Sequence, residues 1–400
     1  MAKHFNPNDI VILDGARTPV GTFMGSLKGV GATELGALAA KEAIKRSQID
    51  PAEIGAVFVG NVIQSSQDAV YMARHVGLKA GAPIEAPAVT VNRLCGSGLE
   101  AILQGAKAIM FGEAEFVLAG GAENMSQAPF AIRGARDGWG LGRQQVEDTL
   151  WGALIDTYGG CGMAETAENL AEKYNISRLE QDEYALRSHL LAVVARERGR
   201  LSLEIIPVEV KGRKGRVTVM EHDEHIRLDT SLEKLGRLKA RFRKNGTVTA
   251  GNASGMNDAG AMVILSSYRV AKERALPILG RIVSWGVAGV DPSIMGIGPV
   301  PATRIALKRA DLSLDVLDVI EVNEAFAAQY LAVEKELGLD RDKTNLYGGG
   351  ISIGHPLAAT GARVTLSALY QLRQSNQRYA LSSMCIGGGQ GIAAILEAAE

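Results

Sequence analysis

The chain has 400 residues, with 43 Lys and Arg against 44 Asp and Glu and an apolar fraction of 46%. That apolar fraction excludes a disordered chain, and the near-zero net charge gives no general attraction to nucleic acid or anionic lipid. We expect no membrane span, because no apolar run reaches about 18 residues, and a cytoplasmic protein, because the first residues lack an apolar signal core. Glycine is frequent, at 47 residues, and the three cysteines are too scattered for a disulfide framework or a zinc site.

The first predicted elements recur 263 residues later. Residues 43–59 read as a helix end, a turn and a β-branched strand, and residues 306–322 repeat this pattern. At the same shift, an amphipathic helix after Gly98 aligns with one after Gly361, and each helix leads into a strand followed by glycines. We therefore predict a duplicated α/β fold whose halves each have a mixed or largely parallel sheet.

A different region separates the two copies. It contains a long polar helix candidate at 177–200, and residues 196–244 carry 14 Lys and Arg against 8 Asp and Glu, a local excess of positive charge. The sequence predicts three parts: residues 1–122 plus 251–273 as the first half, 123–250 as an inserted loop domain, and 274–400 as the second half.

One cysteine stands where the first half turns from strand to helix. Cys95 follows the strand-like run 88–91 and precedes Gly96 and Gly98. A helix N-terminus favours the thiolate, and glycines allow close approach, so Cys95 is a candidate nucleophile; the alternative is a small buried cysteine in a turn. His355 aligns three residues from Cys95 at the 263-residue shift, which would bring the two helix starts together and place a base beside the thiol.

The second half supplies further candidates. Cys385 ends its strand, and a thiol there suits proton transfer. The backbone amides of the glycines behind it, beginning at Gly387, are potential oxyanion donors. Asn323 ends the neighbouring strand and could hold a water or donate to an oxyanion.

Other polar or reactive residues favour structural interpretations. Cys161 lies among glycines of the inserted region, without a counterpart in the repeat. His222 and His225 form a weak metal pattern that we interpret as a solvated loop. The basic run 211–216 is typical of a solvated hairpin turn, and a nucleic-acid site is the minority interpretation. Neither a GxGxxG motif after a strand nor a P-loop motif is present.

Together these segments resemble the thiolase family, the acetyl-CoA C-acyltransferases, nearly end to end. The motifs that carry the resemblance occur in family order, at residues 14–19, 91–98, 120–126, 246–255, 323–326, 354–356 and 385–387. The resemblance implies a thiolase-like duplicated α/β/α/β/α layered fold with an inserted loop domain. It also implies an acyltransferase that reversibly cleaves 3-ketoacyl-CoA with coenzyme A, or condenses acetyl-CoA to acetoacetyl-CoA, through an acyl-cysteine.

The resemblance also implies a role for each motif residue. Cys95 would be the acylated nucleophile, and His355 would activate it. His355 and a water held by Asn323 would form one oxyanion hole, and the amides of Cys95 and Gly387 a second. Cys385 would be the acid and base at the substrate α-carbon.

Coenzyme A and acetyl-CoA are implied as substrates, with no permanently bound cofactor and no metal. The basic part of the insert suits the phosphates of coenzyme A. By resemblance, Arg227, Ala253 and Ser254 line the nucleotide and pantetheine path, and Met163 and Met295 border the acyl pocket. We expect a homodimer or homotetramer with acyl-CoA substrates and no nucleic-acid partner.

Two positions depart from the family pattern. Gly162 stands where many short-chain members have His, and Ala358 stands where many have Gly. The missing side chain at 162 argues against strict acetoacetyl-CoA specificity, so the chain length is left open.

Two alternative functions share this fold. A carrier-protein-dependent ketosynthase would have a Cys-His-His set, whereas position 385 is a cysteine. A non-catalytic acyl-CoA or lipid carrier would lack one of Cys95, His355 and Cys385, and all three are present.

Overall fold

The computed structural model describes residues 5–142, 145–212 and 215–399. The described residues form a ten-stranded sheet in the order β14-β15-β16-β13-β1-β12-β5-β3-β4, with β2 beside β12. Its strands are β1 (Ile10–Arg17), β2 (Gly21–Thr22), β3 (Ile54–Gly60), β4 (Ala88–Val91), β5 (Phe116–Asn124), β12 (Asn257–Ser267), β13 (Gly280–Gly289), β14 (Val319–Val322), β15 (Tyr379–Ile386) and β16 (Gln390–Ala398). Only Val11 and Ile12 of β1 pair with β13, so the sheet divides there into two halves.

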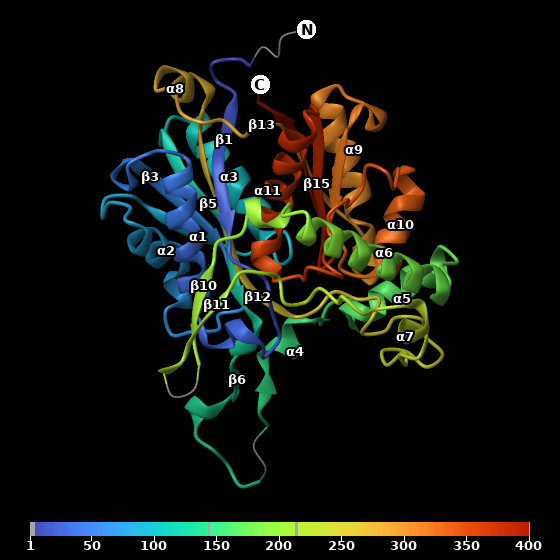
Figure 1. The fold of residues 1–400 in the computed structure, drawn as a ribbon. Helices are drawn as coiled ribbons and strands as arrows, with labels where there is room; N and C mark the ends of the chain where they lie inside the picture. Colours follow the sequence, from blue (N-terminus) through green and yellow to red (C-terminus); the bar gives the residue numbers. More distant parts are fainter. Residues whose placement is uncertain (1–4, 143–144, 213–214, 400) are drawn as a thin grey trace.

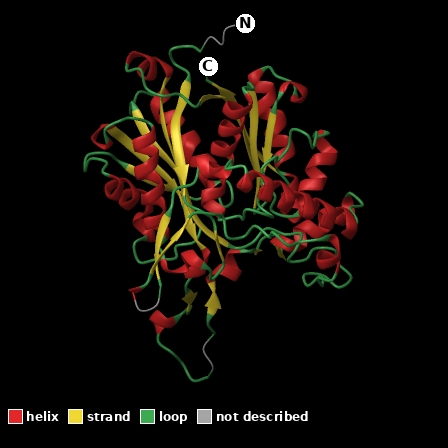
Figure 2. Ribbon diagram, viewed as in Figure 1, coloured by secondary structure: helices red, strands yellow, loops and turns green. Residues whose placement is uncertain are grey.

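The two halves repeat one another, as the sequence predicts. In the first half β3 is parallel to β5, and β12 is antiparallel to β5. In the second half β14 is parallel to β15, and β16 is antiparallel to β15. The predicted duplicated α/β fold with mixed sheets is therefore confirmed, and Figure 2 shows helices around both groups of strands.

Two helices form the central layer, α3 (Ser97–Met110) and α11 (Leu357–Ser375). α11 is buried from Leu357 to Leu372 without a solvent face, which requires cover on every side. Figure 1 shows it between the strands of the two halves. The helices cross where a β-carbon on Gly98 would collide with the Ala358 carbonyl oxygen, and one on Gly361 with the Leu99 amide nitrogen. This close approach brings the two helix starts together, as the 263-residue shift predicts.

The outer faces are covered by a second set of helices. α1 (Ala32–Arg46) and α2 (Met72–Ala80) pack on the first half, and α9 (Pro299–Ala310) packs on β13 and β16 of the second. Strands β1, β5 and β14 are buried at every position, as expected for strands covered on both faces. Cys385 lies within β15, whereas Cys95, Asn323 and His355 lie in the short loops between these buried elements.

The inserted region spreads over both halves. Its helices are α4 (Thr149–Ala153), α5 (Met163–Lys173), α6 (Arg178–Glu197) and α7 (Leu232–Gly236), and its hairpins pair β6 (Phe130–Ala131) with β7 (Glu147–Asp148), β8 (Ile155–Asp156) with β9 (Cys161–Gly162), and β10 (Val208–Lys211) with β11 (Val217–Met220). α5 and α6 pack against α10 (Ala327–Leu337), and α8 (Tyr268–Glu273) follows β12. β5 continues to Asn124, two residues beyond the predicted boundary, and the domain boundaries stay a prediction.

One interpretation of the insert is confirmed only in part. The stretch around His222 and His225 is a loop that exposes Glu221, His222 and Glu224, but Asp223 within it is buried and accepts hydrogen bonds from both terminal guanidinium nitrogens of Arg17, at 2.6 and 2.9 Å. The predicted turn at 211–216 does join two paired strands, although residues 213–214 lie outside the described residues. Across the described ranges, no helix combines the length and the apolarity needed to cross a membrane.

Candidate functional site

Cys95 lies in a tight turn between β4 and α3. The residue before it, Leu94, has a φ of 46°, a left-handed conformation that is uncommon outside glycine. Ser97 braces this turn, because its hydroxyl accepts from the Arg93 amide at 2.9 Å and donates to the Leu94 carbonyl at 2.6 Å. A strained turn before a helix presents the thiol at the helix start, as in other nucleophile elbows.

The resting state of Cys95 differs from the expectation. Burial raises the pKa of its thiol to about 11, and the backbone N–H groups of Gly387 and of Cys95 itself oppose that rise. The expected preference for the thiolate is therefore wrong: desolvation outweighs the helix N-terminus. The same two amides face the sulfur, and their role as an oxyanion hole stays a prediction.

His355 is held in a fixed orientation beside α11. Its backbone N–H donates to Asn257 Oδ1 at 2.9 Å, and its Nδ1 lies 2.7 Å from Thr360 Oγ1. Burial, followed by the charge of Arg363, lowers the pKa of His355 to about 3, so the ring is neutral. When Nδ1–H donates to Thr360, Nε2 carries the free lone pair that a base needs.

Asn323 adjoins His355 at the end of β14. Its Nδ2 lies 3.5 Å from each ring nitrogen of His355, and its buried Oδ1 has no hydrogen-bond partner among the described residues. A buried acceptor without a partner requires a water or a ligand group. Sequence patterns do not single out Asn257 and Thr360, although Thr360 follows His355 by only five residues.

Cys385 completes the group from the end of β15. It is buried and packs with Met163, Met295, Ala325 and Phe326. Burial raises the pKa of its thiol well above its ordinary value, and the charge of Cys95 adds to the effect, so the two thiols lie close together. A protonated thiol at this position can act as a general acid that donates a proton.

Gly387 lies between the two cysteine turns. A β-carbon there would lie 3.2 Å from Met163 Sδ and 3.3 Å from Leu94 Cδ1, tighter than ordinary packing. Both predicted methionines thus adjoin the catalytic candidates.

The predicted coenzyme A residues divide into two groups. Ala253 forms a bridge with Phe326, and the Ser254 amide donates to the Ala325 carbonyl at 2.9 Å, so this turn adjoins the loop after Asn323. Arg227 is exposed and stands apart, with its amide donating to His189 Nδ1 at 3.1 Å. The structure therefore does not bring its side chain into contact with the catalytic candidates.

Two other features lie outside this group. Cys161, in β9, is partly exposed, and burial followed by the charges of Glu165 and Asp156 raises the pKa of its thiol. Among the described residues, no three or more His, Cys, Asp or Glu side chains gather as metal ligands would.

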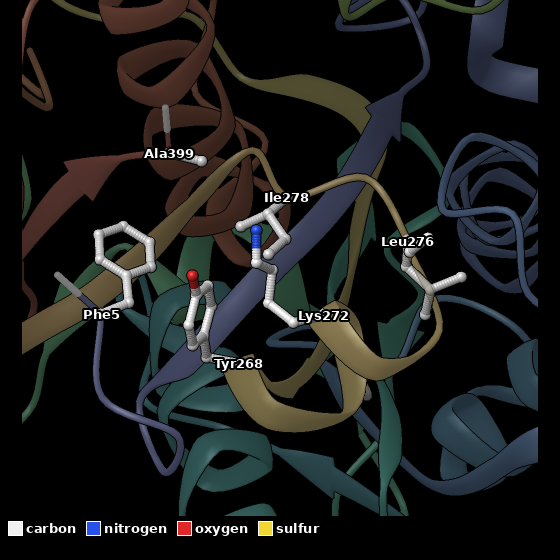
Figure 3. A pocket seen from close by; sticks show the side chains of 7 residues that line it. Phe5, Tyr268, Lys272, Leu276, Ile278 and Ala399 are labelled. Carbon is white, nitrogen blue, oxygen red and sulfur yellow. The ribbon is translucent and has the colours of Figure 1, made fainter. Parts of the chain in front are cut away.

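A cavity of about 320 Å³ lies near the ends of the described chain. Figure 3 shows its lining, which is formed by Phe5, Tyr268, Lys272, Ala275, Leu276, Ile278 and Ala399. β16 ends at Ala398 beside this cavity, and Gly391, at its other end, pairs with Cys385. That length of strand spans about 23 Å, so the cavity is separate from the candidate site.

Comparison with known proteins identifies the family. Residues 10–269 match the family model "Thiolase, N-terminal domain", and residues 276–398 match "Thiolase, C-terminal domain". The beta-ketothiolase BktB of Cupriavidus necator is 52% identical over 97% of this chain and 99% of its own. The mitochondrial 3-ketoacyl-CoA thiolase of Homo sapiens is 50% identical, over 97% and 98%. The acetyl-CoA acetyltransferase of Pseudomonas aeruginosa is 47% identical, over 97% and 99%.

Solved structures agree. The crystal structure of human mitochondrial 3-ketoacyl-CoA thiolase in complex with CoA superposes with a TM-score of 0.95 at 49% identity, over 98% of each chain. The fold and the relatives define an acyltransferase. The chain belongs to the thiolase family.

Proposed function

We propose that this chain catalyses the reversible, CoA-dependent cleavage of 3-ketoacyl-CoA to acetyl-CoA and a shortened acyl-CoA. The observation that carries the proposal is that the starts of α3 and α11, which follow Cys95 and His355, meet, with the buried thiol of Cys385 close to the partly buried thiol of Cys95 and the Gly387 amide directed at the Cys95 sulfur. The names of the relatives, beta-ketothiolase and 3-ketoacyl-CoA thiolase, support it. The ketosynthase and carrier alternatives are not favoured, since position 385 is a cysteine and all three groups are present.

The first half-reaction forms an acyl-enzyme. Nε2 of His355 accepts the proton of Cys95, and Sγ attacks the 3-keto carbon. The amides of Cys95 and Gly387 stabilise the resulting oxyanion. When the oxyanion collapses, the bond between C2 and C3 breaks. His355 and a water on Asn323 stabilise the thioester oxygen of the leaving carbanion, and Cys385 donates its proton to C2.

The second half-reaction releases the acyl group. Free coenzyme A gives its thiol proton to the Cys385 thiolate and attacks the acyl carbon. Cys95 then leaves and recovers its proton from His355. Every proton is returned, so the enzyme is regenerated without a redox group, and the cycle also runs in reverse as a Claisen condensation.

Substrate length is part of this proposal. Gly162 has an ordinary extended backbone, and a β-carbon there would meet its nearest neighbours only at 3.6 and 3.7 Å, so glycine is not required sterically. The missing side chain instead leaves space beside Met163. We propose that acyl groups longer than acetoacetyl are accepted, with Arg227, Ala253 and Ser254 along the coenzyme A path, and that no cofactor is permanently bound.

Assembly and location are further parts of the proposal. The arm that begins with β6 and runs through residues 132–142 extends from the body of the molecule in Figure 1, and it exposes Phe130, Trp139 and Leu141. Exposed apolar side chains on such an arm support a homodimer or homotetramer. Light scattering after size-exclusion chromatography distinguishes these from a monomer. The cytoplasmic location stays a prediction.

The activity has a direct test. The protein is mixed with acetoacetyl-CoA and coenzyme A, and the loss of 3-ketoacyl absorbance is followed, then repeated with longer 3-ketoacyl-CoA substrates. Cys95→Ala should abolish the reaction, whereas Cys161→Ala, the same change at a cysteine outside the site, should retain it. Absence of activity in the unmodified protein, or activity in Cys95→Ala, contradicts the proposal.

A further inference from the structure

A buried carboxylate beside the site takes no part in the chemistry described above. Glu123, on β5, has no exposed surface. Its Oε1 accepts from Asn61 Nδ2 at 3.1 Å and from the Ile63 amide at 3.0 Å, and its Oε2 accepts from the Val62 amide at 3.1 Å and the Ala358 amide at 3.2 Å. One side chain thus satisfies four donors from two separate segments, residues 61–63 and the start of α11.

These segments surround the reacting groups. Ala358 is in the first turn of α11, three residues after His355. Val62, Ile63 and Leu357 pack in one apolar cluster that Cys95 contacts. β5 touches the same turn directly, because a β-carbon on Gly121 would collide with the Ala358 carbonyl oxygen. Glu123 therefore joins the start of α11 to the loop that packs against Cys95.

Only a carboxylate fits this arrangement. Each oxygen accepts two hydrogen bonds, which the ionised carboxylate can do without carrying a hydrogen of its own. In a glutamine at this position, the side-chain NH₂ would replace one of the two oxygens. That NH₂ group, itself a donor, would point at two donors in either orientation of the amide. An apolar replacement would leave three backbone N–H groups without this partner in a buried site, which is costly for folding.

We propose that Glu123 is a positioning residue, which fixes the start of α11 against the loop 61–63 and so holds Nε2 of His355 toward Cys95. The inference rests on the proposed roles of Cys95 and His355. Glu123 acts through the backbone and does not touch the substrate.

The chain offers a matched control in Glu321, on β14. It is also buried, and burial raises the pKa of both carboxyl groups to about 7. Its Oε1 accepts from Gln371 Nε2 at 2.7 Å, thirteen residues along α11 from Ala358. Glu321→Gln therefore reproduces the loss of a buried carboxylate without touching the start of α11.

The experiment compares Glu123→Gln, Glu123→Asp and Glu321→Gln with the unmodified protein. It measures kcat and KM for acetoacetyl-CoA, the rate at which acetyl-CoA acetylates Cys95, and thermal unfolding. Misplacing a catalytic group by about 1 Å costs on the order of 100-fold, so kcat and the acetylation rate of Glu123→Gln should fall by about that factor. KM should stay within about twofold, because substrate contacts remain. Glu123→Asp keeps the charge with a shorter reach and should lose less.

The outcomes separate the two proposals. If the unmodified protein is inactive, the proposed function fails. If the unmodified protein is active but Glu123→Gln and Glu321→Gln have the same kcat, the positioning role is wrong. The role is also wrong if Glu123→Gln changes KM alone. If Glu123→Gln does not fold, Glu123→Asp decides: an unchanged kcat overturns the inference, and a reduced kcat with intact folding supports it.

Discussion

At the scale of single residues, the site pairs a neutral thiol with a neutral imidazole. Burial raises the pKa of Cys95 and lowers that of His355, so each shift disfavours the charged form. An ion pair is therefore not the resting state, and the proton moves to His355 only as the sulfur attacks. Nδ1 of His355 lies 2.7 Å from Thr360 Oγ1, so Nε2 is the ring nitrogen left for this transfer when Nδ1–H donates to Thr360.

This assignment predicts how Cys95 titrates. A thiol with a raised pKa stays protonated as the pH increases through about 8.5, where an ordinary cysteine ionises. The difference in ultraviolet thiolate absorbance between the unmodified protein and Cys95→Ala should remain flat through neutral pH and rise with a midpoint near 11. A step at or below neutral pH would show that the thiolate is the resting form.

At the scale of elements, the contact between α3 and α11 builds the site. The sequence predicts this contact, because the 263-residue shift aligns Gly98 with Gly361, and these are the residues that let the helices touch. The sequence also predicts Cys95 as the nucleophile and His355 as the base, because both precede the helices that the 263-residue shift aligns. It does not predict their protonation, because desolvation depends on packing from segments distant in the chain.

The helix crossing gives a stability prediction. Gly361→Ala places a methyl group against the backbone of Leu99, where neither helix can move away. Overpacking of this kind costs about 1–3 kcal/mol, so the midpoint of thermal unfolding should fall. Gly236→Ala is the control, because a β-carbon there has no neighbour within 4 Å. Equal midpoints for the two variants would argue against a tight crossing.

At the scale of the whole molecule, buried charges attach the insert to the first half. Arg17, on β1, donates to Glu204 at 2.7 Å and to Asp223 at 2.6 and 2.9 Å, and all three side chains are buried. Ser367 of α11 also donates to Glu204, at 2.7 Å. Sequence patterns identify the acidic stretch around Asp223 only as polar, because its partner lies about two hundred residues away.

Removing one partner should therefore destabilise the protein strongly. Asp223→Ala leaves the Arg17 guanidinium without its bidentate partner, and breaking a buried pair typically costs about 3–5 kcal/mol. Glu147→Ala breaks the exposed pair with Arg133, which is worth about 1 kcal/mol or less. Unfolding in urea measures both. A loss for Asp223→Ala no larger than that for Glu147→Ala would contradict the attachment.

The central claim is that one particular sulfur carries the acyl group. The protein is incubated with acetyl-CoA alone, quenched in acid and digested, and the acetylated peptide is identified by mass spectrometry. The acetyl group should be found on Cys95 and should transfer to added coenzyme A. Cys385→Ser should still be acetylated while losing condensation. Acetylation of Cys161 or Cys385 in place of Cys95, or no covalent intermediate in a protein that cleaves acetoacetyl-CoA, would contradict the mechanism.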